Sequence, residues 1–237
     1  NQQPNKIYKN LGGLKFEDVS ETADINQGKV WANGVTVADV NADGLLDIYV
    51  SQGGPKQRSD RQNLLFINKG EFKFEESAAA YGLNDNGIST QAVFFDYDKD
   101  GDLDCVVSNE NEFYGLDPRR FYAQIDASAE NLYNSSTHLY RNDGGQFKDV
   151  SKQAGVLNAS FGLGVAVSDI NEDGWLDIYI ANDYYVPDAL YLNQGDGSFR
   201  NQVKETTKQV SFYGMGVDID DLNNDGLKDI FVLDMAS

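Results

Sequence analysis

The stretch DVNADGLLDIYV, residues 39–50, places acidic or amide side chains at alternate positions before a glycine. Asp39, Asn41 and Asp43 precede that glycine, and Asp47 follows directly before an apolar run. Repulsion among carboxylates held so close together is unfavourable unless a positive charge lies between them. The stretch therefore predicts a tight acidic turn that closes around a cation and leads into a β-strand.

The same pattern occurs three more times, as DYDKDGDLDCVV, DINEDGWLDIYI and DLNNDGLKDIFV, which begin at Asp96, Asp169 and Asp221. A second motif lies between the copies: an apolar segment ending in Asn, a glycine turn, and a segment that carries Phe. Its four copies begin at Ile7, Leu64, Leu139 and Leu190. Two motifs repeated in a fixed order are the signature of a repeat architecture with one supersecondary unit per period.

Each unit is predicted to form four short strands. Alternating apolar residues precede the acidic turn, β-branched and aromatic residues follow it, and the second motif supplies the third and fourth strands. Four-stranded units repeated in series indicate an all-β fold, a β-propeller built of blades, because a β-sandwich would not require such regular repetition. Helical periodicity is absent apart from single turns at ETAD, SAAAYG and SKQAG.

The order of the motifs leaves two architectures open. The chain begins with third and fourth strands (7–19) and ends with first and second strands (217–233). These halves could complete one blade and close a ring of four. Alternatively, residues 1–237 form one propeller region cut from a larger ring, which the end at LDMAS, directly after a strand, favours. Because the sequence begins with Asn1 and not with methionine, we expect it to be a piece of a longer protein.

The acidic turns resemble the first half of an EF-hand loop, with oxygen ligands at positions 1, 3, 5 and 9, glycine at 6 and a backbone carbonyl at 7. A strand replaces the second helix. The predicted side-chain ligands are Asp39, Asn41, Asp43, Asp47; Asp96, Asp98, Asp100, Asp104; Asp169, Asn171, Asp173, Asp177; and Asp221, Asn223, Asp225, Asp229. The predicted carbonyl ligands are Leu45, Asp102, Trp175 and Leu227.

The identity of the cation follows from the donor set. Asp, Asn and Gly are also common in ordinary β-turns, but four copies in the same relation to a following strand favour metal sites. An all-oxygen set favours a hard cation, and a chain with one Cys and one His cannot build a multi-histidine zinc site. We therefore expect about four Ca²⁺ ions with a structural role, and no other cofactor.

Composition excludes several classes of partner. The chain has 19 basic and 38 acidic residues and a net charge of −19, so nucleic acid and anionic membranes are unfavourable partners. No apolar stretch is long enough to insert into a membrane.

Several segments carry a family resemblance. The repeated turn followed by DIYV resembles the FG-GAP or VCBS repeat of integrin-like β-propellers. The segments 147–156, 177–199 and 223–235 resemble VCBS-repeat surface proteins associated with an ASPIC/UnbV module, of Bacteroidetes type. The resemblance implies calcium within blades, a ring of commonly seven blades, and a secreted or surface protein, for example one lipid-anchored at the bacterial outer membrane in its full-length form.

A long insertion is expected between the second and third units, at residues 111–137. Insertions on a rigid scaffold often bind partners, and aromatic and Arg residues suit contact surfaces. The alternative is a loop that folds over a blade edge and buries its aromatic residues. The partner-binding candidates are Phe113, Tyr114, Arg119, Arg120, Phe121 and Tyr122.

Two functions remain open. The first is a non-enzymatic, extracellular calcium-binding module that binds protein or glycan at a cell surface, as part of a larger surface complex. The second is a calcium-dependent polysaccharide lyase. A lyase requires a base with a lowered pKa, and cations near the carboxylate of its acidic substrate. Arg119 and Arg120 are the one pair of adjacent basic residues in a strongly acidic chain. The charge therefore favours the binding module.

Overall fold

In the computed structural model, residues 4–25, 31–54 and 58–235 are described. Three consecutive segments of the chain each form a four-stranded antiparallel sheet in which neighbours in sequence are neighbours in space. The first sheet consists of β3 (Ala32–Ala38), β4 (Asp47–Gln52), β5 (Leu64–Asn68) and β6 (Phe74–Glu76). The second consists of β7 (Ile88–Phe95), β8 (Asp104–Glu110), β9 (His138–Asn142) and β10 (Phe147–Asp149). The third consists of β11 (Gly162–Ser168), β12 (Asp177–Asn182), β13 (Ala189–Asn193) and β14 (Phe199–Asn201).

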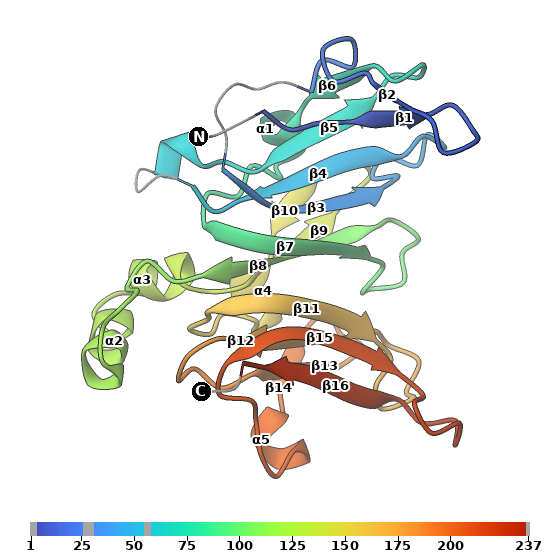
Figure 1. Ribbon diagram of the computed structural model, residues 1–237. Helices are drawn as coiled ribbons and strands as arrows, with labels where there is room; N and C mark the ends of the chain where they lie inside the picture. The colour runs from blue at the N-terminus through green and yellow to red at the C-terminus, as the bar shows by residue number, and fades with distance from the viewer. Residues whose placement is uncertain (1–3, 26–30, 55–57, 236–237) are drawn as a thin grey trace.

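Each end of the described chain forms a two-stranded sheet. The N-terminal hairpin pairs β1 (Tyr8–Asn10) with β2 (Phe16–Asp18), and the C-terminal hairpin pairs β15 (Gly214–Asp220) with β16 (Asp229–Asp234). The two hairpins lie at opposite ends of the series of sheets (Figure 1). They share no sheet, so the closed ring of four units is not formed. The all-β class and the four-stranded units predicted from the sequence are confirmed.

The first strands of successive sheets, β3, β7, β11 and β15, lie side by side (Figure 1). Hydrogen bonds join them: the Thr36 hydroxyl donates to the Ala92 carbonyl at 2.6 Å, and the Thr90 hydroxyl donates to the Gly162 carbonyl at 2.6 Å. At Gly164 a Cβ atom would lie 2.8 Å from the backbone of the C-terminal hairpin, so only glycine allows this approach. Short side chains thus allow the sheets to pack in series.

The apolar core lies between consecutive sheets. Leu65 of the first sheet packs in one cluster with Val107 of the second, and Val106 of the second packs in another with Ile178 of the third. These side chains come from strands two and three, whose central residues are apolar and buried. Each such side chain stabilises the fold by about 1.5–3 kcal/mol through burial.

Helices occupy only connections. The short segments are η1 (Arg58–Asp60), α1 (Ala78–Tyr81), α4 (Ser151–Ala154) and α5 (Val203–Thr206). The predicted turns at SAAAYG and SKQAG correspond to α1 and α4, whereas ETAD forms no helix. Residues 111–137 connect β8 to β9 and contain α2 (Pro118–Ile125) and α3 (Ala129–Asn134), which periodicity did not predict. Asp117 and Ser128 cap these two helices, which begin one residue later.

Candidate metal centre

Four acidic loops connect first strands to second strands: loop 1 (39–47), loop 2 (96–104), loop 3 (169–177) and loop 4 (221–229). All four share one backbone shape, with left-handed φ angles at positions 4 and 6. The φ angles at position 6 are 85–96°, at Gly44, Gly101, Gly174 and Gly226. At position 4 they are 56–62°, at Ala42, Lys99, Glu172 and Asn224. The repeated sequence pattern therefore produces the same backbone turn in all four loops.

The carboxylate at position 9 is fully buried in loops 1, 2 and 3, where Asp47, Asp104 and Asp177 are each 0% exposed. Backbone N–H groups hold both of its oxygens. In loop 2, Tyr97 N–H donates to Oδ2 of Asp104 at 3.0 Å, and Asn142 N–H donates to Oδ1 at 2.8 Å. The same two bonds recur in loops 1 and 3. Both oxygens of this carboxylate therefore accept backbone hydrogen bonds in these three loops.

An asparagine at the end of each third strand braces the loop of its own sheet. Its backbone N–H reaches the position-9 carboxylate, and its side-chain amide donates to the carbonyl at position 8. The amide–carbonyl pairs are Asn68–Leu46 at 2.9 Å, Asn142–Leu103 at 3.1 Å and Asn193–Leu176 at 3.3 Å. The sequence showed these residues as the Asn that ends each apolar segment of the second motif, without indicating this role.

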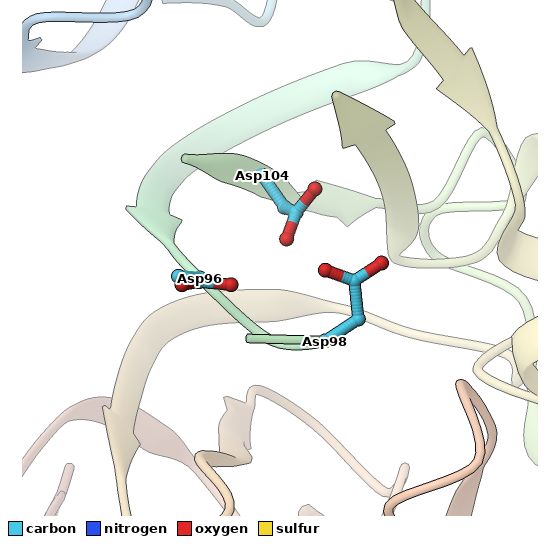
Figure 2. A group of neighbouring side chains, drawn as sticks. All are labelled: Asp96, Asp98 and Asp104. Atoms are coloured by element: carbon cyan, nitrogen blue, oxygen red, sulfur yellow. The ribbon is translucent and has the colours of Figure 1, made fainter. Parts of the chain in front are cut away.

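Positions 1, 3 and 5 differ between the loops. In loops 1, 3 and 4 the residue at position 3 is Asn, and its amide donates to the carboxylate at position 5 at 2.9–3.0 Å. In loop 2 position 3 is Asp98, whose carboxylate side chain has no N–H group to donate. One carboxylate oxygen from each of Asp96, Asp98 and Asp104 lies within 4.8 Å of the others (Figure 2). Oδ1 of Asp96 and Oδ1 of Asp98 are enclosed and have no hydrogen-bond partner.

The electrostatics of loop 2 are unfavourable without a cation. Burial, together with the charges of Asp98 and Asp100, raises the pKa of Asp104 to about 7, although its two backbone N–H partners act in the opposite direction. Burial and the charge of Asp100 also raise the pKa of Asp98. Enclosed oxygens of like charge and without partners, in an oxygen-only donor set, fit a hard divalent cation such as Ca²⁺.

The residues at position 7 contact the carboxylates of their loops through their backbone N–H groups. In loops 1 to 4, the N–H of Leu45, Asp102, Trp175 and Leu227 donates to Oδ1 of the carboxylate at position 5, at 2.8–2.9 Å. Their role as carbonyl ligands stays a prediction.

The partner-binding candidates of the insertion fall into two groups. Phe121 is fully buried in a cluster with Phe161, which it stacks at a ring distance of 5.3 Å, and Phe113 packs against that cluster. Tyr114 is 64% exposed and Tyr122 is 40% exposed. The exposed group also contains Arg119 and Arg120 at the start of α2.

The chain's single histidine ties the insertion to the second sheet. Nδ1 of His138 lies 2.6 Å from Oδ2 of Asp85, and Nε2 lies 2.9 Å from the Tyr133 carbonyl of α3. Both partners are acceptors, so the ring donates from both nitrogens and carries a positive charge. The nearby Asn109 amide, 3.2 Å from Nδ1, donates instead to the Ser136 carbonyl.

The pKa values of this buried pair move apart. Burial alone would raise the pKa of Asp85, but the charge and hydrogen bond of His138 outweigh it and lower the pKa to about 2. Burial lowers the pKa of His138, and the charge of Asp85 outweighs it, so the net direction is upward.

A second tie, also not predicted, joins the insertion to the first sheet. Glu112 forms ion pairs with Arg58 of η1, at 2.9 Å, and with Arg61. Arg61 is almost fully buried and also donates to the Asn86 carbonyl at 2.8 Å. The sequence contains the charges, but nothing in it shows that they meet.

Serial four-stranded sheets, each with an acidic loop between its first and second strands, define a class of β-repeat protein. The profile of the FG-GAP-like repeat matches residues 1–50, 127–180 and 169–232. The chain belongs to the FG-GAP-like repeat family.

Related sequences agree with that assignment. Cartilage acidic protein 1 of Mus musculus is 34% identical over 88% of this chain and 30% of its own length. Integrin alpha-3 of Mus musculus is 30% identical over 49% of this chain and 12% of its own, and integrin alpha-6 of Homo sapiens is 39% identical over 32% and 8%. The chain spans under a third of the length of these curated relatives.

Two solved structures are similar in overall arrangement. An Agrocybe aegerita lectin specific for non-reducing terminal N-acetylglucosamine has a TM-score of 0.48, 19% identity, and coverage of 95% of this chain and 54% of the lectin. A Bacillus licheniformis rhamnogalacturonan lyase has a TM-score of 0.45, 14% identity, and coverage of 87% and 41%. These low scores carry no functional argument. Within the described residues, no helix has the length and apolar character to span a membrane.

Proposed function

We propose that this chain is part of a calcium-stabilised β-propeller that binds protein or glycan at a cell surface. The observation that carries the cation sites is loop 2, where Asp96, Asp98 and Asp104 converge and where Oδ1 of Asp96 and Oδ1 of Asp98 are enclosed without a hydrogen-bond partner. Membership in the FG-GAP-like repeat family supports an interaction module, since relatives include integrin alpha chains and cartilage acidic protein 1.

The proposed role of the cation is structural. It would join the first and second strands of a sheet by replacing repulsion between carboxylates with coordination. Loop 2 supplies a carboxylate at each of positions 1, 3, 5 and 9, whereas the other loops supply three and an amide. Because affinity rises with ligand charge, loop 2 would bind Ca²⁺ most tightly. Loop 4, whose position-9 carboxylate is not fully buried, would bind it most weakly.

The proposed location is extracellular. Extracellular calcium modules bind at roughly 10⁻⁴–10⁻³ M, so sites of this kind fill outside the cell and empty in the cytosol. Location at a bacterial outer membrane with a lipid anchor stays a prediction.

The proposed contact surface is the exposed side of the insertion. Tyr114 meets Tyr184, in the connection between β12 and β13, edge-to-face at 5.3 Å, and Tyr184 meets Tyr213 at 6.4 Å, so rings from three separate segments form a row. Exposed tyrosines supply contact area to proteins and to sugar rings. The lyase alternative needs cations facing an enclosed substrate, whereas Arg119 and Arg120 are exposed on α2.

The test is thermal unfolding in Ca²⁺ and in EGTA, with metal analysis of the protein. When the free Ca²⁺ concentration is 100 times the Kd of a site, binding at that site should stabilise the fold by about 2.7 kcal/mol. The variant Asp100→Ala in loop 2 should lose more of this gain than the matched variant Asp225→Ala in loop 4. No bound calcium and no change in Tm would refute the cation sites.

The binding half of the proposal has a separate readout. A glycan array and a panel of extracellular proteins would be probed with the wild-type chain and with Tyr114→Ala. The variant should lose most of the wild-type binding but little of its Tm, because Tyr114 is mostly exposed and its contacts with Tyr184 lie at the surface. Binding that is unchanged in Tyr114→Ala would move the contact surface elsewhere.

A further inference from the structure

The asparagines at the ends of the third strands also reach across to the preceding sheet. The Asn142 amide donates to the Val40 carbonyl at 3.2 Å, and the Asn193 amide donates to the Tyr97 carbonyl at 2.8 Å. Val40 is position 2 of loop 1, and Tyr97 is position 2 of loop 2. Each amide therefore contacts two acidic loops, the one in its own sheet and the one in the sheet before it.

The residue at position 2 connects this contact to the metal ligands. Tyr97 uses its carbonyl to accept from Asn193 and its N–H to donate to Oδ2 of Asp104. Val40 does the same between Asn142 and Asp47. These groups are buried, so water cannot replace the bonds when a loop moves. The peptide that positions one carboxylate is thus held by the next sheet.

We propose that cation binding in loops 1, 2 and 3 is coupled in series, with Asn142 and Asn193 as the positioning residues. The inference rests on the proposed cation sites. Ordering of loop 2 around an ion fixes Tyr97, which fixes the Asn193 amide between Tyr97 and the Leu176 carbonyl of loop 3. Loop 3 is then partly ordered before its own ion binds, so its affinity rises.

The chain contains its own controls. The Asn68 amide donates within its own sheet to the Leu46 carbonyl, and no cross-sheet bond is found for it among the described residues. Loop 4 follows loop 3 in the series, and within the described part of the chain no third-strand asparagine joins these two loops. Loops 2 and 4 therefore both neighbour loop 3, and only loop 2 is joined to it by a buried amide.

Trp175 reports on loop 3, and because the Lys99 ammonium of loop 2 lies 4.0 Å from the centre of its ring, the part of the titration that Asp96→Ala removes is assigned to loop 2 and the part that remains to loop 3. It occupies position 7 of loop 3, and its N–H donates to Asp173 at 2.8 Å. Excitation of tryptophan transfers energy to Tb³⁺, which takes the oxygen ligands of Ca²⁺, and the transfer falls steeply with distance. Trp31, the other tryptophan, precedes β3, eight residues before loop 1 begins. The variant Trp31→Phe removes its signal, and all measurements use it as background.

The experiment titrates residues 1–237 with Tb³⁺ and records emission sensitised by Trp175. Loop 2 is disabled by Asp96→Ala and, as a matched control, loop 4 by Asp221→Ala. One buried hydrogen bond corresponds to a factor of about two to ten in an equilibrium constant. We expect Asp96→Ala to weaken Tb³⁺ binding at loop 3 about fivefold, and Asp221→Ala to change it less than twofold.

The same pair is then measured with Asn193→Leu, and with Asn68→Leu as the control that breaks a bond within one sheet. The effect of Asp96→Ala should vanish with Asn193→Leu and persist with Asn68→Leu. Equal effects of the loop 2 and loop 4 variants, or an effect that survives Asn193→Leu, would overturn the coupling and leave the cation sites standing. Absence of sensitised emission would overturn the cation sites themselves. If Asn193→Leu does not fold, Asn193→Ala replaces it, and the comparison of Asp96→Ala with Asp221→Ala still decides.

Discussion

Loops 2 and 4 share their spacing and their φ pattern, but they lie in different surroundings. In loop 2, Asp104 is fully buried, and a third strand supplies the Asn142 N–H to its Oδ1. In loop 4, Asp229 accepts only from Leu222 N–H, at 3.0 Å, and no third strand lies beside β16 in the described chain. The motif therefore sets the shape of the loop, whereas the rest of the sheet encloses it.

The largest effect should come from replacing the position-9 carboxylate in both loops. In saturating Ca²⁺, Asp104→Asn should destabilise the fold by about 3 kcal/mol, because one buried N–H loses its acceptor and a ligand is lost. Asp229→Asn should cost less than about 1 kcal/mol, because water can replace its single bond. Urea unfolding of the two variants measures both values.

Calcium removal sharpens this comparison. In EGTA the cost of Asp104→Asn should shrink, since removing one of several enclosed carboxylates relieves repulsion that the cation otherwise offsets. Equal losses in the two loops, with and without calcium, would show that the third strand contributes nothing to the site.

A smaller effect depends on pH and belongs to the second sheet alone. The pKa of folded His138 is raised above its ordinary value, so its contribution is complete below about pH 6.5 and is lost as pH rises through the folded pKa. Stability should fall by about 1.4 kcal/mol for each pH unit between the two pKa values. Thermal unfolding from pH 6 to 9 in saturating Ca²⁺, which keeps Asp104 ionised, measures the slope.

The matched variant is His138→Gln, which removes the chain's single histidine. It should unfold at lower temperature and show no slope in this pH range. A slope that survives the substitution would assign the pH dependence to another group. Below pH 4 the folded wild type should also weaken, because the pKa of Asp85 is lowered to about 2 and its contribution is lost as pH falls through that value.

The smallest effect should come from the surface of loop 4. Lys228 pairs with Asp220 at 3.0 Å, and both side chains are exposed. Exposed ion pairs contribute little in salt, so Lys228→Met should change Tm by less than about 2 °C. A larger change, measured by differential scanning calorimetry, would show that loop 4 is more enclosed than the structure describes.

The repeats made the fold predictable to the level of single strands. Phe16, Phe74, Phe147 and Phe199 begin the fourth strands, as the glycine turns before them indicate. The helices of the insertion were not predicted, because α2 and α3 are too short for a clear period. Their starts were nevertheless marked in the sequence by Asp117-Pro118 and by Ser128.

The acidic loops were predictable for the same reason, since side chains at positions 1, 3 and 5 are local in sequence. The contacts of Asn142 with Val40 and of Arg61 with Glu112 are not local. They depend on how one sheet packs on the next, and no periodicity in one chain records that packing. The candidate ligands could therefore be predicted from the sequence, whereas the asparagines and backbone groups that position them were found only in the structure.

The insertion has a consequence for how this molecule loses its structure. Repeat proteins whose units contact only their neighbours can unzip from one end. Here the insertion, residues 111–137, is joined to the first sheet by the ion pairs of Glu112 and connects two strands of the second sheet. It also contacts Phe161 and Tyr185, which flank strands of the third sheet. Peeling away any of these sheets must also break the hold on the others. The three should melt together, whereas the two terminal hairpins, which the insertion does not hold, should fray first.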